Sequence, residues 1–272
     1  MDFLHLVVLA VVQGITEFLP ISSSGHLVLV PHLLGWEDQG LIFDISLHFG
    51  TLGAVLVYFR RDVAAMFGGL VSLLTGRYRD SGARLVVNLV TATIPVGLAG
   101  LAVKDVIESY GRDVLLLAFT SIVFGLLLWY ADVLARRRPA DVLRTVDDIS
   151  LPTALMWGVY QAMALVPGVS RSGICVTGGR AMGATRELAG HFGSLMAIPT
   201  ITLAMLLSLG DISSELNWHN AGSTLLTGAA VSFVCGLIGI KLLVEWCARV
   251  GYVPFVVYRI VLGLVLVGLF AL

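Results

Sequence analysis

Two polar segments, QGITEFLPISSSGH at residues 13–26 and PGVSRSG at residues 167–173, interrupt apolar sequence in the two halves of the chain. The flanking apolar runs are residues 3–12, 27–34, 151–166 and 174–182. A run of about ten residues makes about 15 Å of helix, half the roughly 30 Å hydrocarbon core of a bilayer. Such pairs of short runs predict two re-entrant helical hairpins, over residues 3–35 and 151–187. Irregular backbone at membrane depth is tolerated only where protein or a water-filled cavity covers it, so we expect a site where the hairpins meet.

The composition requires a membrane as the solvent. The chain has 272 residues, of which 57% are hydrophobic and 13% are charged. That charged share is about half of the roughly 25% typical of soluble domains, which excludes a disordered chain, a coiled coil and an ordinary cytosolic enzyme. Six further stretches are long enough to cross a bilayer. They are residues 41–59, 85–103, 114–134, 191–209, 222–246 and 253–272. We therefore expect an all-α integral membrane protein with six full transmembrane helices and two re-entrant hairpins, in a single membrane domain over residues 1–272.

Arginine and lysine predict the orientation, because cytoplasmic loops carry an excess of both. The loops after the first, third and fifth spans carry the arginines Arg60, Arg61, Arg77, Arg79, Arg84, Arg136, Arg137, Arg138, Arg144 and Arg249. The opposite loops carry Lys104 and Arg112. Both chain termini are therefore expected outside the cytoplasm, with the first hairpin entering from outside and the second from inside. Residues 63–74 are expected to form an interfacial helix. The net charge of −1 gives no basic surface for a nucleic acid partner.

The two halves align at an offset of 148 residues. The alignment pairs Gln13 with Gln161, Ser22 with Ser170, Ser24 with Ser172, and Gly25 with Gly173. A second repeated sequence follows each hairpin, HFGTL at 48–52 and HFGSL at 191–195. Three crossings per half is an odd number, so the second copy, residues 149–272, must be inverted relative to the first, residues 1–135. Inverted-topology repeats place their site near the midplane, between broken helices.

The sequence of the second hairpin predicts an anion-binding site, with phosphate as the expected ligand. Ser170, Arg171 and Ser172 lie in a glycine-flanked turn before an apolar helix, where free backbone N–H groups and the helix dipole favour negative charge. The guanidinium of Arg171 suits phosphate oxygens, and the serines add hydroxyl donors. The alternative is that Arg171 snorkels, or pairs with Glu17 only to stabilise the fold. Intramembrane arginine is costly, which favours function.

The first hairpin predicts a metal site and a nucleophile. Gln13 and Glu17 share one helix face, and their oxygens suit a hard divalent cation, Mg²⁺ or Ca²⁺, with phosphate and water completing its shell. The alternative for Glu17 is a protonated acid in a helix contact. Ser23 and His26 can face one cavity, with His26 taking the serine proton or itself attacking phosphorus. Ser22 is a further phosphate donor or a helix cap.

Three other ionisable residues receive a structural interpretation. His48 and His191 occupy equivalent positions in the repeat, at the start of spans, and are expected to be structural. Arg259 lies near the end of a span, where snorkelling explains a long cationic side chain.

These motifs resemble those of the undecaprenyl-pyrophosphate phosphatase family, the integral-membrane bacitracin-resistance type, over nearly the whole chain. The family's (E/Q)-x-x-x-E is here Gln13 to Glu17, and F-L-P-x-S-S-x-G-H is here Phe18 to His26. The family's P-G-x-S-R-S-x-x-T is here Pro167 to Cys175. At two positions the chain has a weaker metal ligand or hydrogen-bond donor than the family's motif allows. Gln13 carries one negative charge fewer for a metal, and Cys175 replaces a threonine hydroxyl.

The resemblance implies hydrolysis of undecaprenyl pyrophosphate to undecaprenyl phosphate and inorganic phosphate, which recycles the lipid carrier for cell-wall synthesis and confers bacitracin resistance. It implies roles for Gln13, Glu17, Ser23, His26, Ser170, Arg171 and Ser172, a location in the bacterial cytoplasmic membrane, and a cavity that opens outward. The attacking group is left open between Ser23, His26 and a metal-activated water. A polyprenyl-phosphate transporter or flippase that uses the same phosphate site is the alternative, and a homodimer is left open.

Overall fold

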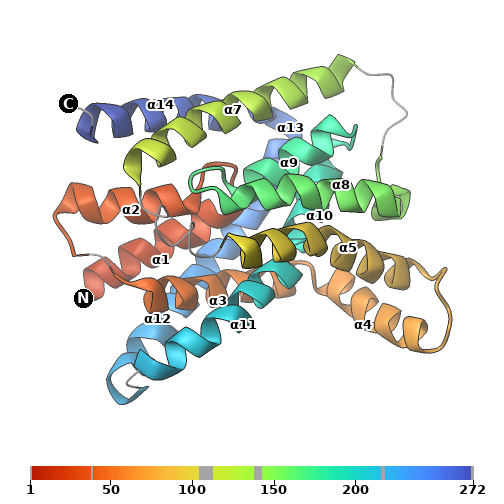
Figure 1. Cartoon of the computed structure of the whole chain (residues 1–272), viewed down its shortest axis with the longest axis horizontal. Coiled ribbons are helices and arrows are strands. Elements are labelled where there is room, and N and C mark those ends of the chain that lie inside the picture. Colours follow the sequence, from red (N-terminus) through yellow and green to blue (C-terminus); the bar gives the residue numbers. More distant parts are fainter. Residues whose placement is uncertain (1, 38, 104–112, 138–142, 216–217, 271–272) are drawn as a thin grey trace.

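A computed structural model describes residues 2–37, 39–103, 113–137, 143–215 and 218–270, and these ranges form helices and short turns without a β-strand. The helices are α1 (Phe3–Phe18), α2 (Ser23–Leu34), α3 (Leu41–Tyr58), α4 (Arg60–Leu74), α5 (Ser81–Ala102), α7 (Val114–Arg137), α8 (Leu151–Ala162), α9 (Arg171–Ala181), α10 (Arg186–Leu195), α11 (Ala197–Glu215), α12 (Trp218–Lys241), α13 (Cys247–Val250) and α14 (Val253–Phe270). Short helical turns are η1 (Val146–Asp148), η2 (Met163–Leu165) and η3 (Leu242–Trp246). The prediction of an all-helical protein is confirmed for these ranges (Figure 1).

Four helical segments of the described chain are long and apolar enough to cross a membrane, Ser81–Ala102, Val114–Arg137, Arg186–Ser208 and Gly222–Val250. A fifth candidate is the pair Ile42–Tyr58 and Arg60–Leu74, which bends by 84° at its break. The bend separates α4 from the predicted span 41–59. The last predicted span, 253–272, corresponds to the shorter apolar helix α14, and its two final residues lie outside the described ranges.

Two hairpins turn near the middle of the molecule. In Figure 1, α1 and α2 open toward the end where both termini lie, and α8 and α9 open toward the opposite end, where α4 turns into α5. The first break is shorter than the polar segment predicted: α1 continues through Glu17 to Phe18, and α2 begins at Ser23. The Gln13 side chain donates a hydrogen bond to Glu17 one turn later, which favours the extra helix. Pro20 then ends it, because the residue before proline is pushed into extended backbone.

Close helix packing brings the first hairpin against the C-terminal half of the chain. The helix α1 packs on α12, which also packs on α3, while α14 packs on α7 and α5 on α8. At Gly14, an added Cβ would lie 2.5 Å from the Cβ of Cys235 and 2.6 Å from the carbonyl oxygen of Ser232. Only glycine therefore lets α1 approach α12 this closely.

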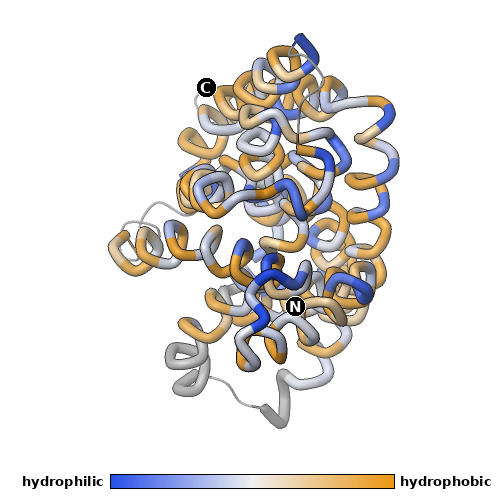
Figure 2. The backbone as a smooth tube through the Cα atoms, turned by 90° about the vertical axis from the view of Figure 1, so that its right-hand side faces the viewer, coloured by the Kyte–Doolittle hydropathy of each residue, from blue (hydrophilic) through white to orange (hydrophobic). Residues whose placement is uncertain are grey.

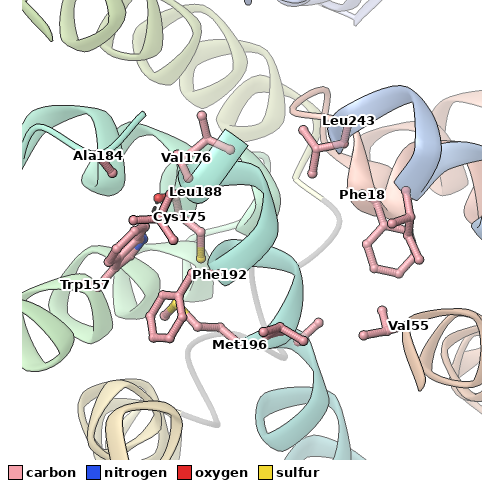
Figure 3. Close-up of a cluster of buried hydrophobic side chains, with 14 of the residues drawn as sticks. Phe18, Val55, Trp157, Cys175, Val176, Ala184, Leu188, Phe192, Met196 and Leu243 are labelled. Carbon is pink, nitrogen blue, oxygen red and sulfur yellow. Dashed lines mark hydrogen bonds between the residues drawn. The ribbon is translucent and has the colours of Figure 1, made fainter. Parts of the chain in front are cut away.

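The buried core lies beside the breaks of both hairpins. Figure 3 shows Trp157, Phe192, Met196, Cys175 and Phe18 in this cluster. The indole N–H of the fully buried Trp157 donates to the carbonyl of Cys175 at 2.7 Å, which ties α8 to α9. This core gives the hairpins a rigid support.

The outer surface remains strongly apolar, as expected for a chain surrounded by lipid. Large side chains are exposed on several outer helices, including Leu98 (66%), Phe119 (65%) and Leu264 (59%). Figure 2 shows that hydrophobic residues predominate along helices throughout the molecule. Exposed apolar surface on this scale requires a membrane, because water-soluble monomers rarely expose contiguous apolar patches above a few hundred Å². The chain is therefore an integral membrane protein.

Candidate functional site

The two polar turns have the same unusual backbone. Ser22 has φ = 68° and Ser170 has φ = 71°, and they are the only non-glycine residues with positive φ among those described. They are the two serines that the offset of 148 aligns. Each also makes the same side-chain contact, because Ser22 Oγ lies 3.2 Å from Ser24 Oγ and Ser170 Oγ lies 3.2 Å from Ser172 Oγ. Backbone in such sparsely populated regions costs about 1–3 kcal/mol per residue and clusters at functional sites.

Glu17 is the centre of the polar contacts between the hairpins. Its Oε2 accepts hydrogen bonds from Gln13 Nε2 at 3.0 Å and from Ser23 Oγ at 2.9 Å. Its Oε1 accepts from Arg171 Nη2 at 3.0 Å. The Glu17 side chain is 6% exposed and that of Arg171 13% exposed, so the pair is largely shielded from solvent. The contact between Glu17 and Arg171 that the sequence left as an alternative is present, and it joins the two hairpins.

A second contact between the hairpins uses Ser172. Its hydroxyl donates to the carbonyl of Leu19 at 2.8 Å, across the two breaks. Ser170 instead caps its own helix, because its Oγ accepts the N–H of Gly173 at 3.2 Å. The side chain of Ser22 makes no such cap at the start of α2. Of the two roles predicted for Ser22, the structure therefore does not show the helix cap.

A cavity of about 240 Å³ lies against these groups. Its lining residues are Glu17, Ser22, Ser23, Ser24, His48, Ala164, Gly168, Ser170, Arg171, Thr200, Ile201 and Ala204. Of the residues predicted for the site, the cavity thus brings together Glu17, Ser22, Ser23, Ser170 and Arg171. Gln13, His26 and Ser172 are buried behind its lining. The guanidinium of Arg171 and the hydroxyl donors around it suit an anion such as phosphate.

His26 has partners other than Ser23. Its Nδ1 donates to the carbonyl of Ser22 at 2.7 Å, and its Nε2 accepts from the hydroxyl of Tyr258 at 2.5 Å. The two rings stack with their planes 5° apart. Ser23, as described above, donates to Glu17. The predicted pairing of Ser23 with His26 as its base is therefore not the one in this structure, which places a carboxylate beside the serine.

Two polar residues of the cavity were not predicted from the sequence. His48, interpreted as structural, has its Nε2 3.6 Å from Glu17 Oε2 and reaches the cavity from α3. Thr200 lines the cavity from α11, and its hydroxyl is buried without a hydrogen-bond partner among the described residues. A signal for His48 was available in the repeated HFG-(T/S)-L sequence. No comparable motif marks Thr200, because a lone threonine in an apolar span is common.

The sequence interpretation of Arg259 is wrong. Instead of snorkelling, its side chain is fully buried. A helix end predicted from apolar length gives no information about which face of the helix packs inward, so the burial of this residue could not be foreseen.

Gln13 and Glu17 are the two residues predicted to supply oxygen ligands for a divalent cation. The Oε1 atom of Gln13 is buried without a hydrogen-bond partner among the described residues, next to the Glu17 carboxylate. No group of three or more His, Cys, Asp or Glu side chains in the described chain is arranged to hold a metal. The residues therefore fit a hard cation only if substrate oxygens and water supply the rest of its shell.

Cys175, at the position of the family's threonine, is buried away from the cavity. Its Sγ lies 3.7 Å from Oε1 of Gln161, the residue that aligns with Gln13 in the repeat. Thr177 does not replace the missing hydroxyl, because it donates to the carbonyl of Gly173 within its own helix.

Comparison with known proteins gives consistent similarity along the chain. Residues 6–265 match the model of the family described as bacitracin resistance protein BacA. An undecaprenyl-diphosphatase 2 of Stutzerimonas stutzeri is 44% identical over 100% of this chain and 99% of its own length. Undecaprenyl-diphosphatases of Ruegeria pomeroyi (44%) and Magnetococcus marinus (47%) match over 99% and 98% of this chain, and over the same shares of their own lengths.

Proposed function

Since the chain belongs to the BacA bacitracin resistance protein family, we propose that it is an undecaprenyl-diphosphatase. It hydrolyses undecaprenyl pyrophosphate to undecaprenyl phosphate and inorganic phosphate. This reaction recycles the lipid carrier for cell-wall synthesis. The observation that carries the assignment in this chain is the contact between Glu17 and Arg171, which brings an acid and a guanidinium from the two hairpins to one cavity.

The cavity suits the pyrophosphate head of the substrate. Arg171 offers a planar fork of donors for phosphate oxygens, and Ser22 and Ser170 add hydroxyl groups. In this structure Arg171 donates to Glu17, and the hydroxyl groups of Ser22 and Ser170 contact those of Ser24 and Ser172. When the phosphates enter, the guanidinium of Arg171 turns to them and stabilises the negative charge that develops during phosphoryl transfer. The prenyl chain would extend from this cavity into the surrounding lipid.

Ser23 is the attacking group best placed by the contacts. Its hydroxyl already donates to Glu17 Oε2, so the carboxylate can take the proton as the serine oxygen attacks the terminal phosphorus. The new Ser23 Oγ–P bond replaces the bridging P–O bond, and undecaprenyl phosphate leaves. Water then cleaves the phosphoserine and releases inorganic phosphate. His26, which is bound to Tyr258 and to the Ser22 carbonyl, holds the Ser22 turn in this scheme.

A divalent cation, Mg²⁺ or Ca²⁺, belongs to the proposal. Glu17 and the unpartnered Oε1 of Gln13 would hold it. When bound, it neutralises charge on the phosphate oxygens.

The membrane arrangement is part of the same proposal: an inverted-topology repeat of residues 1–135 and 149–272, with six crossings and the hairpins as re-entrant segments. The matched backbone of Ser22 and Ser170 supports the repeat. The hairpins open toward opposite ends of the molecule, which supports its inversion (Figure 1). Both termini lie at the end away from the α4–α5 turn, which supports a periplasmic position for them and an outward-facing site in the bacterial cytoplasmic membrane.

Transport of a polyprenyl phosphate is not favoured, because the relatives reported above are named as diphosphatases. The test uses purified protein in detergent with undecaprenyl pyrophosphate as substrate. We expect undecaprenyl phosphate and inorganic phosphate in a 1:1 ratio to the substrate consumed. Intact lipid after prolonged incubation with folded protein would contradict the proposal, and passage of the intact lipid across liposomes would then indicate transport.

A further inference from the structure

Arg259 on α14 makes an unusual set of contacts, because the acceptors of its guanidinium are backbone carbonyl oxygens. Nη1 donates to Val169 at 2.9 Å and to Pro20 at 3.5 Å, Nη2 to Gly168 at 3.0 Å and to Thr120 at 3.3 Å, and Nε to Ser121 at 3.0 Å. Pro20 lies in the break of the first hairpin, and Gly168 and Val169 lie in the break of the second. One side chain thus binds both turns and α7.

The guanidinium of Arg259 is also buried without a counter-ion among the described residues. Its side chain is fully buried, and in the part of the chain that the structure describes no carboxylate lies within ion-pair distance of it. The contrast is Arg180, which is similarly buried but donates to the carboxylate of Asp132 at 2.9 Å. A buried unpaired charge is costly, so a role in stability alone does not explain Arg259.

The carbonyl contacts determine where the backbone N–H groups of the second turn point. The peptide bonds of the described residues are trans, and a trans peptide holds its C=O and the following N–H in opposite directions. Because the Val169 carbonyl faces Arg259, the N–H of Ser170 points away from it. Ser170 lines the cavity and Arg259 lies behind the turn, where its Nη1 would be 2.9 Å from a Cβ added at Gly173.

The contacts also fall next to the strained residues. Val169 directly precedes Ser170, and Pro20 lies two residues before Ser22. Positive-φ backbone at a serine persists only where its surroundings over-determine it. Hydrogen bonds from one guanidinium to the residues before both serines provide such a restraint, and they fix the two turns relative to each other.

We propose that Arg259 is a positioning residue for the reaction: it holds the two serine turns in register and directs the Ser170 amide into the cavity as a further phosphate donor. The inference rests on the proposed function. The positive charge of Arg259, which has no carboxylate partner among the described residues, also increases the attraction of the cavity for an anion.

The first test is Arg259→Lys, with Arg180→Lys as the matched control. Lysine keeps the charge but has three donors on one atom and cannot bind five carbonyls in three segments. We expect Arg259→Lys to lower kcat for undecaprenyl pyrophosphate about 100-fold, because small misplacements of catalytic groups carry such losses. Arg180→Lys should lower the thermal unfolding temperature with kcat within about threefold of wild type. Equal kcat in wild type and folded Arg259→Lys would overturn the proposal.

A gentler variant covers the case in which Arg259→Lys does not fold. A Cβ added by Gly125→Ala on α7 would lie 3.2 Å from Arg259 Cβ and 3.5 Å from its Nε, so the side chain must shift slightly. Gly100→Ala is the control, because its added Cβ would have one ordinary contact, to Leu165 at 3.7 Å. We expect about tenfold lower kcat in Gly125→Ala alone. Wild-type kcat in both folded variants would overturn the proposal.

A binding measurement separates this inference from the proposed function. Inorganic pyrophosphate is titrated into wild type and into a folded Arg259 or Gly125 variant by calorimetry, which requires no turnover. The proposed function fails if wild type does not cleave the lipid, whereas the inference concerns only the ratio of affinities. We expect about tenfold weaker pyrophosphate binding in the variant, because the Ser170 amide is no longer held toward the anion. Equal affinity would overturn the role of Arg259.

Discussion

Ser22 and Ser170 lie 148 residues apart in the sequence, yet each adopts the same strained backbone, with φ = 68° and φ = 71°, immediately before the second helix of its hairpin. A serine pays for positive φ with stability, whereas glycine adopts it freely. The strain at both positions therefore has a measurable consequence.

Replacing Ser22 with glycine should separate stability from activity. We expect Ser22→Gly to stabilise the protein by about 1 kcal/mol, because it relieves the backbone strain, and to lower kcat, because it removes a hydroxyl from the cavity. Thermal unfolding in detergent and phosphate release are measured on the same preparation. A variant that is both less stable and fully active would contradict this interpretation of Ser22.

Arg171→Lys tests whether the fork of the guanidinium matters. Lysine keeps the positive charge but cannot bind two phosphate oxygens in parallel, so we expect kcat/KM to fall by about 100-fold or more. Steady-state phosphate release gives the value, and Arg249→Lys on α13, outside the cavity, serves as the control. Near-normal turnover of Arg171→Lys would exclude the bidentate contact.

Ser23→Ala and Tyr258→Phe distinguish the proposed nucleophile from the residue behind it. Ser23→Ala removes the atom that bonds to phosphorus, and we expect at least about a 1000-fold loss of kcat. Tyr258→Phe removes one hydrogen bond to His26 and should lower kcat about tenfold. Acid-quenched reactions with substrate labelled in the terminal phosphate should contain phosphoserine in wild type. If that label appears on histidine instead, His26 is the attacking group.

The ionic cluster around Asp132 should affect stability without affecting the reaction. Asp132 is 3% exposed and accepts from Arg136, Arg180 and Arg186, which join α7, α9 and α10 away from the cavity. We expect Asp132→Asn to destabilise the protein by about 3 kcal/mol, because it leaves buried guanidinium groups without their counter-ion. Thermal unfolding gives the loss, and kcat of the remaining folded protein should match wild type. A large drop in that kcat would mean that the cluster and the cavity are coupled.

Several features of the site were predictable from sequence because they depend on local chemistry. The polar breaks, the equivalence of Ser22 and Ser170 in the repeat, and the presence of Glu17 and Arg171 in one site follow from residue types that are costly inside a membrane. The partners of individual atoms were not predictable. The spacing of Ser23 and His26 allows a contact, but Tyr258, more than 200 residues away in sequence, contacts the histidine instead.

Two other differences have separate physical origins: a contact within one helix for the first, and packing between distant helices for the second. The break in the first hairpin is short because Gln13 and Glu17 support one more helical turn before Pro20. Arg259 is buried because α14 packs its face against α7, next to both breaks. Hydropathy along α14 alone contains no information about which of its faces packs against α7.

The most direct test of the account is phosphate release from undecaprenyl pyrophosphate by folded wild type, by Glu17→Gln, and by wild type with EDTA. Glutamine keeps the shape of residue 17 but removes the negative charge that accepts the Ser23 proton and attracts the cation. We predict metal-dependent release by wild type, restored by Mg²⁺ or Ca²⁺ after EDTA, and a loss of about 100-fold to 10,000-fold in Glu17→Gln. Release by Glu17→Gln at the wild-type rate would contradict a site built on the contact between Glu17 and Arg171.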